Sequence, residues 1–396
     1  MPTRVIPTAT LTPALDERQA PVTLRRGGAP YRAVTCTADE LVSLAAEMQG
    51  VTEQSAFSSP CWLGPLVETL GSGARGRMFG VAVRSEADDT LAGAFPLAVT
   101  REHGCDVVRY AEFGVTDYTA PIFGPAFPAS AAEAQQFYDT IRAALSGYDL
   151  IRFERLQTDL KAYPALPAIY PGAVASRAVG NVIVVTDSVQ SYVADLGRKF
   201  RKEVDRCKRH IAAAGPFVLE RAAGEKRTAA AFGWLEKLQS QRWEETGANY
   251  RLDDPAYAQF YRAVIARGVP EGFAEVITLS AGDTLVGAVF GIRSAGRFTV
   301  LRIASDDAQW GRFSPGRITL LAVMESLVAE GVRNFDLGIG DYQFKRRLGA
   351  DTFGLADLIV PLTWKGTAVA AAIGAKRVLA RQPVLKRLAD RVRGRA

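Results

Sequence analysis

Residues 311–321, GRFSPGRITLL, contain the residue types of an anion-binding turn at the start of a helix. Two glycines with four residues between them have the spacing of a phosphate-binding loop, but Arg317 replaces the lysine and Ile318 the magnesium-binding Ser or Thr. Ser314 is expected to cap a helix whose open backbone N–H groups and positive dipole end suit a phosphate or pyrophosphate. A capped helix without a ligand is the alternative. The residues expected at the anion are Arg312, Ser314, Gly316 and Arg317.

A second polar segment, residues 338–347, directly follows an apolar run that is typical of a buried strand. If a helical turn begins near Asp341, then Asp341 and Lys345 lie four residues apart on one face of it. A carboxylate and an amine at a strand end could orient a substrate or move a proton. We therefore expect Asp341 and Lys345 to be catalytic and Tyr342 to contact the substrate. The alternative is a surface ion pair worth under about 1 kcal/mol.

A third candidate is the basic stretch of residues 198–209, RKFRKEVDRCKR. Its apolar residues recur at helical spacing, which predicts an amphipathic helix with one densely basic side. Arg201 on that side is a candidate ligand for an anionic cofactor or an acidic substrate. A solvated helix face is the alternative.

Several kinds of site are disfavoured by composition. The chain has two histidines, His103 and His210, far apart in the sequence, and its four cysteines form no C-x-x-C pair. We therefore expect no metal site and no histidine-based triad. The start of the sequence lacks the apolar core of a secretory signal, and no apolar run is long enough to span a bilayer. These features favour a cytoplasmic protein.

The net charge of +6 is concentrated at the C-terminal end. Residues 366–396 hold eight basic residues and one acidic residue, which leaves 40 basic and 41 acidic residues in positions 1–365. Because the rest of the chain is balanced, we expect no nucleic-acid partner. The basic, amphipathic tail could dock peripherally on an anionic inner-membrane surface, pack on its own domain, or remain solvated.

An internal echo predicts the organisation of the chain. Residues 89–97, DTLAGAFPL, match residues 283–291, DTLVGAVFG, and a second pair relates residues 148–153 to residues 335–339. Two similar units of about 180 residues explain both pairs, and units of that size are domains rather than solenoid repeats. A β-β-α-β order within each unit predicts an α/β fold with a mixed sheet (α+β).

The length of 396 residues also suits two domains. Pro, Gly, Ala and Ser cluster in residues 171–181 and predict the link between the halves there. The predicted parts are a poorly ordered segment at 1–30, a first domain at 31–178, a second domain at 179–365 and the basic amphipathic tail at 366–396.

Five blocks in order resemble the CelD-type acetyltransferases, a branch of the GNAT superfamily associated with cellulose and exopolysaccharide biosynthesis. Together they span about residues 40–360. The blocks are SAFSSPCW at residues 55–62, FGVTDYTAP at 113–121, SPG at 314–316, FDLG at 335–338 and GDYQFK at 340–345.

The resemblance implies two GNAT-like acyl-CoA N-acyltransferase domains in tandem, related to Fem-type transferases. It places the pyrophosphate of an acyl-CoA at the helix beginning near Pro315. The acceptor would be an amine on a small molecule, a sugar or a cell-envelope precursor, contacted by Asp117 and Tyr118 of the first domain. Phe344 stands where the family usually has Tyr, so a phenol is missing there. A Fem-like transferase that uses aminoacyl-tRNA and a non-catalytic accessory factor in polysaccharide biosynthesis remain as alternatives.

Overall fold

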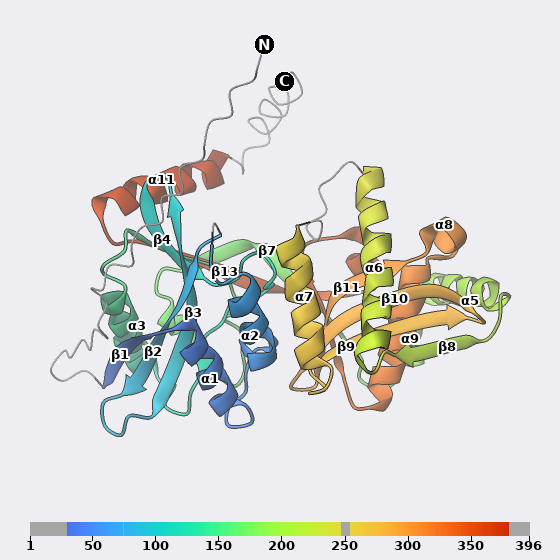
Figure 1. The fold of residues 1–396 in the computed structure, drawn as a ribbon, viewed down its shortest axis with the longest axis horizontal. Helices are drawn as coiled ribbons and strands as arrows, with labels where there is room; N and C mark the ends of the chain where they lie inside the picture. Colours follow the sequence, from blue (N-terminus) through green and yellow to red (C-terminus); the bar gives the residue numbers. More distant parts are fainter. Residues whose placement is uncertain (1–29, 74, 247–253, 380–396) are drawn as a thin grey trace, which may run out of the picture.

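A computed structural model describes residues 30–73, 75–246 and 254–379 of the chain. Residues 1–29 of the segment expected to be poorly ordered, and the part of the basic tail beyond residue 379, lie outside this range. Figure 1 shows the two halves of the chain side by side, each with helices packed on a sheet.

The first half contains the elements β1 (Tyr31–Cys36), α1 (Ala38–Met48), α2 (Pro60–Thr69), β2 (Arg77–Ser85), β3 (Leu91–Glu102), β4 (Cys105–Tyr110), β5 (Ile122–Phe123), α3 (Ala131–Ala144), β6 (Leu150–Leu156) and β7 (Val174–Val184). The second half contains α4 (Val189–Asp195), α5 (Arg198–Ala212), β8 (Phe217–Arg221), α6 (Glu225–Thr246), α7 (Pro255–Gly268), β9 (Ala274–Ala281), β10 (Thr284–Ser294), β11 (Arg297–Ser305), α8 (Asp307–Trp310), α9 (Pro315–Ala329), β12 (Asn334–Ile339), α10 (Gln343–Arg347), β13 (Asp351–Pro361) and α11 (Trp364–Leu379).

The strands form one continuous sheet that runs through both halves in the order β1-β2-β3-β4-β6-β13-β7-β12-β11-β10-β9-β8. The first half contributes β1 to β4 and then β6, which is parallel to β4. The second half repeats this order with β8 to β11 and then β12, which is parallel to β11. The echoed residues 89–97 and 283–291 fall at β3 and β10, the third strand of each half, which confirms the predicted duplication.

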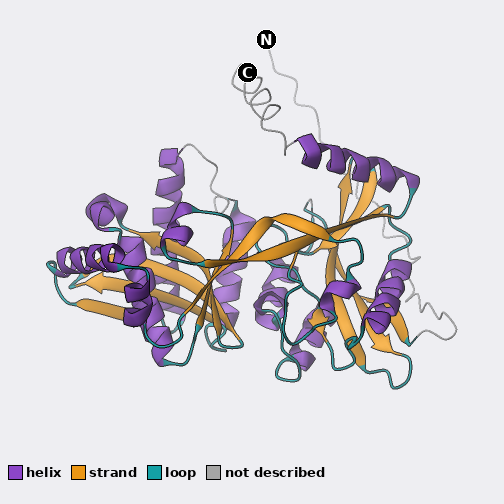
Figure 2. Cartoon of the chain, turned by 180° about the vertical axis from the view of Figure 1, so that it is seen from behind, coloured by secondary structure: helices purple, strands orange, loops and turns teal. Residues whose placement is uncertain are grey.

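The last strand of each half pairs with the other half. β13, which follows β12 in the sequence, pairs with β6, whereas β7, which follows β6, pairs with β12. β7 and β13 also pair with each other and cross between the halves (Figure 2). The halves are therefore joined by exchanged strands, which fixes their relative orientation through backbone hydrogen bonds.

The predicted link at residues 171–181 overlaps this exchange. The turn around Pro171 and Gly172 ends at residue 173, and the rest of the predicted link is strand β7. The predicted domain boundary between residues 178 and 179 thus lies inside β7. Small residues serve packing here: a Cβ atom at Gly180 would lie 2.2 Å from the Phe353 ring of β13, so glycine lets that ring cover the strand.

A shared apolar core also joins the halves. α2 packs against α7, and the rings of Trp62 and Phe260 meet edge to face with centroids 4.9 Å apart. Both side chains are fully buried, and they belong to one cluster with residues of α1 and α6. On the second half's sheet, Ala288, Phe290 and Ile292 of β10 belong to this cluster and Val289 belongs to a second one under α9, as the two-residue period of a strand requires.

Candidate functional site

The parallel strands β11 and β12 pair only at their beginnings. Arg297, Phe298 and Thr299 are in register with residues 334–336, and no pairing between these two strands follows. A cavity of about 880 Å³ lies at the opening beyond this pairing, and it is lined by Leu301 and Arg302 of β11 and by Ile339 of β12. The split between the two strands therefore opens into space large enough for a ligand.

A loop from the first half closes one side of this opening. Its Asp117 lines the cavity, and its Oδ2 atom accepts a hydrogen bond of 3.3 Å from the backbone N–H of Ile339. The close approach depends on Gly338, whose φ is +73° and at which a Cβ atom would lie 2.3 Å from Asp117 Oδ2. Glycine is thus needed at residue 338 for both its backbone conformation and the space that the carboxylate occupies.

Asp117 belongs to a cluster of buried charges. Asp336 is 1% exposed, accepts hydrogen bonds from the Tyr118 hydroxyl (2.7 Å) and the Gly338 N–H (2.8 Å), and pairs with Arg297 at 3.1 Å. Burial raises the pKa of Asp336. Burial, together with the nearby Asp336 charge, raises the pKa of Asp117 to about 6. Of these two carboxyl groups, Asp117 lines the large cavity and is poised to exchange a proton near neutral pH.

Lys345 supplies the central positive charge of this cluster. Its Nζ donates hydrogen bonds to the carbonyl oxygens of Gly338 (3.0 Å) and Ile339 (2.6 Å), and the residue is 3% exposed. Burial lowers the pKa of Lys345, while the charges of Asp117 and Asp336 act in the opposite direction. Lys345 therefore fastens the end of β12 from inside the protein.

The expected pairing of Asp341 with Lys345 is not observed. α10 begins at Gln343, so Asp341 precedes the helix and the two side chains do not share a helical face. Asp341 is 65% exposed and pairs with Arg346, whereas Lys345 points inward. Burial of the lysine stem and the carbonyls at the end of β12 decide this orientation. Tyr342 does line the cavity, as a substrate-contacting residue would.

Tyr118 lies away from the large cavity. It is 2% exposed and lines a separate pocket of about 190 Å³, together with Arg297 and Asp336. Its hydroxyl bond to Asp336 joins the two halves. Tyr118 therefore does not line the large cavity and does not contact a ligand there directly.

The predicted anion-binding turn is built differently from the expectation. A short 3-10 turn at Gly311–Phe313 places Ser314 in the left-handed region with φ of 50°, and its side chain makes no capping hydrogen bond. The preceding turn thus puts Ser314 at the N-cap position without the extended backbone that a serine cap needs. Gly316 packs closely under β11, where an added Cβ would lie 3.2 Å from Ser305 Oγ.

Helix α5 covers part of this turn. Arg317 pairs with Glu203 of α5 at 2.7 Å and lies 5.2 Å from the centroid of the Phe200 ring. Arg312 is exposed on the same turn, and Arg201 is exposed on α5. None of the four predicted anion ligands, nor Arg201, lines the large cavity. Arg317 is engaged within the protein, so Arg312 is the arginine of the turn that is open to solvent.

Charged residues of β6, of the exchanged strands β7 and β13, and of α11 complete the cavity wall. Arg155 pairs with Glu112, and Arg377 of α11 pairs with Asp357 of β13 at 2.7 Å. Sequence reasoning missed these residues because strand exchange brings them together from distant positions. The charged alternation in β6, Arg152-Phe-Glu154-Arg155, was the available signal. The charged residues on this wall are Glu112, Glu154, Arg155, Arg177, Asp357 and Arg377.

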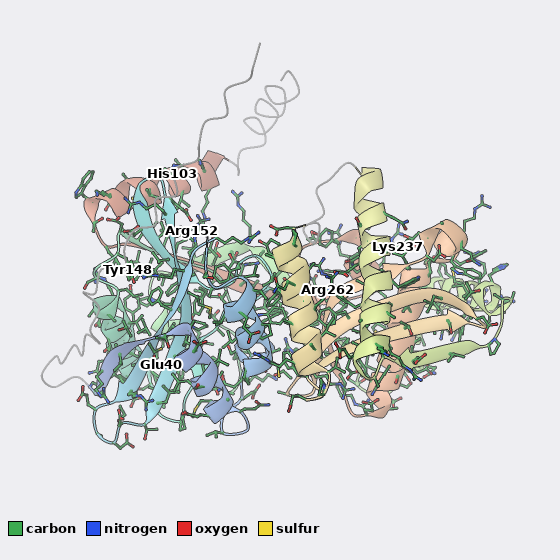
Figure 3. The ribbon with its side chains drawn as sticks, in the orientation of Figure 1. Glu40, His103, Tyr148, Arg152, Lys237 and Arg262 are labelled. Carbon is green, nitrogen blue, oxygen red and sulfur yellow. The ribbon has the colours of Figure 1, made fainter. Side chains whose placement is uncertain are left out.

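A neighbouring cavity of about 620 Å³ lies beneath α11 and shares Arg177 and Arg377 with the first. His103, in the turn between β3 and β4, and Arg152 of β6 also line it (Figure 3). Within the described residues, no group of three His, Cys, Asp or Glu side chains is arranged to hold a metal ion. Over the same residues, no helix has both the length and the apolar character needed to cross a bilayer.

Comparisons with known proteins agree with this architecture. Residues 198–346 match the family described as "Acetyltransferase (GNAT) domain". The crystal structure of FemX shares 11% sequence identity with this chain, covers 82% of it and 96% of its own length, and aligns with a TM-score of 0.54. No curated protein sequence matches the chain.

Two further solved structures align with lower scores. A tandem GNAT protein from the clavulanic acid biosynthesis pathway shares 14% identity over 84% of this chain and 99% of its own, with a TM-score of 0.44. L-PGS from Bacillus licheniformis shares 11% identity over 83% of this chain and 94% of its own, with a TM-score of 0.48. The comparisons support a relation to the GNAT superfamily, but they do not support the narrower CelD-type family. The acetyltransferase match over residues 198–346, the repeated strand order and the fold shared with FemX show that the chain has a GNAT-like fold with duplicated domains.

Proposed function

We propose that the protein is an N-acyltransferase that moves an acyl group from acyl-CoA to an amine in the cavity between its halves. The observation that carries this proposal is the Asp117 carboxyl group, which lines that cavity beside the split strands and has its pKa raised to about 6. The acetyltransferase match over residues 198–346 supports it, because that range includes β11, β12 and the turn between them.

Asp117 would act as the general base. Its carboxylate takes a proton from the amine, and the freed nitrogen electron pair attacks the thioester carbonyl carbon. The new C–N bond replaces the C–S bond, the nitrogen loses a second proton as the amide forms, and coenzyme A takes up that proton and leaves as the thiol. Lys345 and Asp336 do not touch the reacting atoms in this scheme; they position the end of β12 and set the charge around Asp117.

The turn before α9 is our proposed seat for the diphosphate of the donor. The helix has 15 residues, so its N-terminal end carries a positive dipole that favours an anion. Arg312 on this turn is exposed and could pair with the diphosphate, with Ser314 and Gly316 supplying close polar and backbone contacts. Arg317 would hold the turn against α5 through Glu203.

Acetyl-CoA is expected to raise the melting temperature of the purified protein. A ligand that binds only the folded state adds about 2.7 kcal/mol at a hundredfold excess over Kd. Arg312→Glu should remove most of the shift, because it reverses the charge at the proposed diphosphate site. Arg227→Glu, an exposed arginine on α6, is the matched control and should keep the full shift. A shift that Arg312→Glu leaves intact would rule out this seat for the donor.

The same thermal-shift assay separates the alternatives. Stabilisation by bulk aminoacyl-tRNA and not by any acyl-CoA would favour a Fem-like transferase. If neither acetyl-CoA, longer acyl-CoAs nor tRNA changes the melting temperature, a non-catalytic accessory role would be favoured. The exposed basic residues of α5, including Arg201, would be the first place to seek a tRNA contact.

Our proposal for the acceptor and for the cellular location rests on the resemblance of the sequence motifs to the CelD-type family. We propose an amine on a sugar or cell-envelope precursor, acylated in the cytoplasm. Contact of residues 366–396 with an anionic membrane surface would bring the enzyme to such a precursor. Sedimentation of the full chain with anionic vesicles, and its absence after removal of residues 380–396, tests that contact.

The rate of transfer is expected to rise with pH through about 6. Asp117 can take a proton only as the carboxylate, and its pKa is raised to about 6, so kcat/KM for the donor should grow about tenfold per unit at lower pH and then level off. Measurement at saturating acceptor tests this. If the midpoint of the rise in kcat/KM lay more than about one pH unit from 6, a group other than Asp117 would control the rate.

A further inference from the structure

Two exposed aromatic rings, one of which lines the cavity, stack against each other. Tyr342 is 59% exposed and Phe344 is 48% exposed, and their rings are stacked with centroids 6.1 Å apart and planes 23° apart. Tyr342 lines the cavity. Within the described residues, the exposed large hydrophobic side chains include one other aromatic, Trp364 at the start of α11. An exposed apolar patch at a cavity mouth is the usual mark of a binding surface.

The segment that carries these rings is anchored firmly. Asn181 of β7 donates hydrogen bonds to the carbonyl oxygens of Gly338 (2.8 Å) and Gly340 (2.9 Å). The Tyr342 ring lies over Gly340, where an added Cβ would come within 2.6 Å of it, and Lys345 Nζ lies 5.3 Å from the ring centroid. The Tyr342 ring is therefore held in place rather than displayed on a loose turn, which lowers the entropy cost of binding a ligand against it.

The wall of the cavity has a different character from these rings. Carboxylates and guanidinium groups are held in pairs, such as Arg155 with Glu112 and Arg377 with Asp357. Paired charges present both hydrogen-bond acceptors and donors with little net charge, which suits the hydroxyl groups of a neutral polyol. An aromatic face suits the apolar C–H face of a saturated ring, through the same dispersion contacts that aromatic side chains make in interfaces.

We infer that the acceptor is a cyclic amino sugar whose ring lies against Tyr342 and Phe344, with its hydroxyl groups on the charged wall and its amine toward Asp117. This inference rests on the proposed acyl transfer for the role of the amine. The missing phenol at residue 344 fits it, because a stacking surface needs an aromatic ring and no hydroxyl.

The test is equilibrium binding measured by ligand-observed NMR titration, without an acyl donor. Three amines separate the contributions: glucosamine has ring and hydroxyl groups, the open-chain glucamine has hydroxyl groups alone, and cyclohexylamine has a ring alone. Glucosamine is expected to bind about tenfold more tightly than either of the others, the factor that corresponds to about 1.4 kcal/mol.

Variants locate the contact. Tyr342→Ala should weaken glucosamine binding about tenfold and erase its advantage over glucamine, while Tyr342→Phe should preserve both. Trp364→Ala, which removes an exposed aromatic ring elsewhere, is the matched control and should change nothing. Equal binding of glucosamine and glucamine, absence of saturable glucosamine binding, or indifference to Tyr342→Ala would overturn the inference.

This design keeps the two proposals apart. If glucosamine binds more tightly than glucamine but no donor acylates it, the amino-sugar inference is supported and the proposed reaction is contradicted. Equal acylation of open-chain and cyclic amines would support the reaction and contradict the ring contact.

Discussion

Replacement of Asp117 by Asn is expected to lower kcat/KM for acyl transfer by about 100-fold or more, the range that a positioned general base contributes. The amide has nearly the shape of the carboxylate and can still accept the hydrogen bond from the Ile339 N–H. It cannot take a proton from the amine. The loss should therefore appear in the rate of CoA thiol release and leave the acetyl-CoA thermal shift in place.

Asp341→Asn is the matched control for this variant. Asp341 is a neighbouring aspartate near the same strand end, but it is exposed and paired with Arg346. We expect its activity to stay within about twofold of the original, since an exposed ion pair contributes little. If Asp341→Asn were inactive and Asp117→Asn active, the catalytic carboxylate would be the one first indicated by the sequence pattern.

Replacement of Lys345 by Met is expected to lower the free energy of unfolding by roughly 3 kcal/mol or more, as removal of one partner from a buried charge cluster does. The variant removes the ammonium whose charge interacts with Asp117 and with Asp336, which is 1% exposed, and it leaves the carbonyls of Gly338 and Ile339 without their donor. Urea denaturation followed by circular dichroism measures the change.

Arg346→Met tests whether the loss of stability comes from the buried position of Lys345 rather than from the removal of any positive charge in this segment. Arg346 is the next residue, is 57% exposed at its side chain and pairs only with the exposed Asp341 among the described residues. Its loss should cost under about 0.5 kcal/mol. A Lys345→Met variant as stable as Arg346→Met would mean that the lysine does not hold the end of β12.

The duplicated fold was predictable because the repeat survives in short local patterns. The Asp-Thr-Leu turn before β3 recurs before β10, and both strands carry a glycine at the same place, Gly93 and Gly287. These patterns record backbone requirements that depend on neighbours in sequence. The exchange of β7 and β13 leaves no such record, because each of these strands pairs with residues that are distant in the sequence.

The site was only partly predictable for a similar reason. Asp117 and Tyr118 were indicated by a motif, but which of them faces the cavity depends on Gly338 and Asp336, which come from the other half. Lys345 was recognised as important, yet its inward direction follows from carbonyls at the end of β12 rather than from helical spacing. Ser314 has the residue type of a cap, and a preceding 3-10 turn overrides that preference.

The central claim is that the split between β11 and β12 receives the acyl donor next to Asp117. Hydrogen exchange of the full chain with and without acetyl-CoA, followed by mass spectrometry, tests it most directly. We predict slower exchange in residues 300–305, 311–317 and 337–342, because a donor seated there covers the open ends of both strands and the turn before α9. Unchanged exchange in all three segments, with protection elsewhere in the chain, would contradict the account.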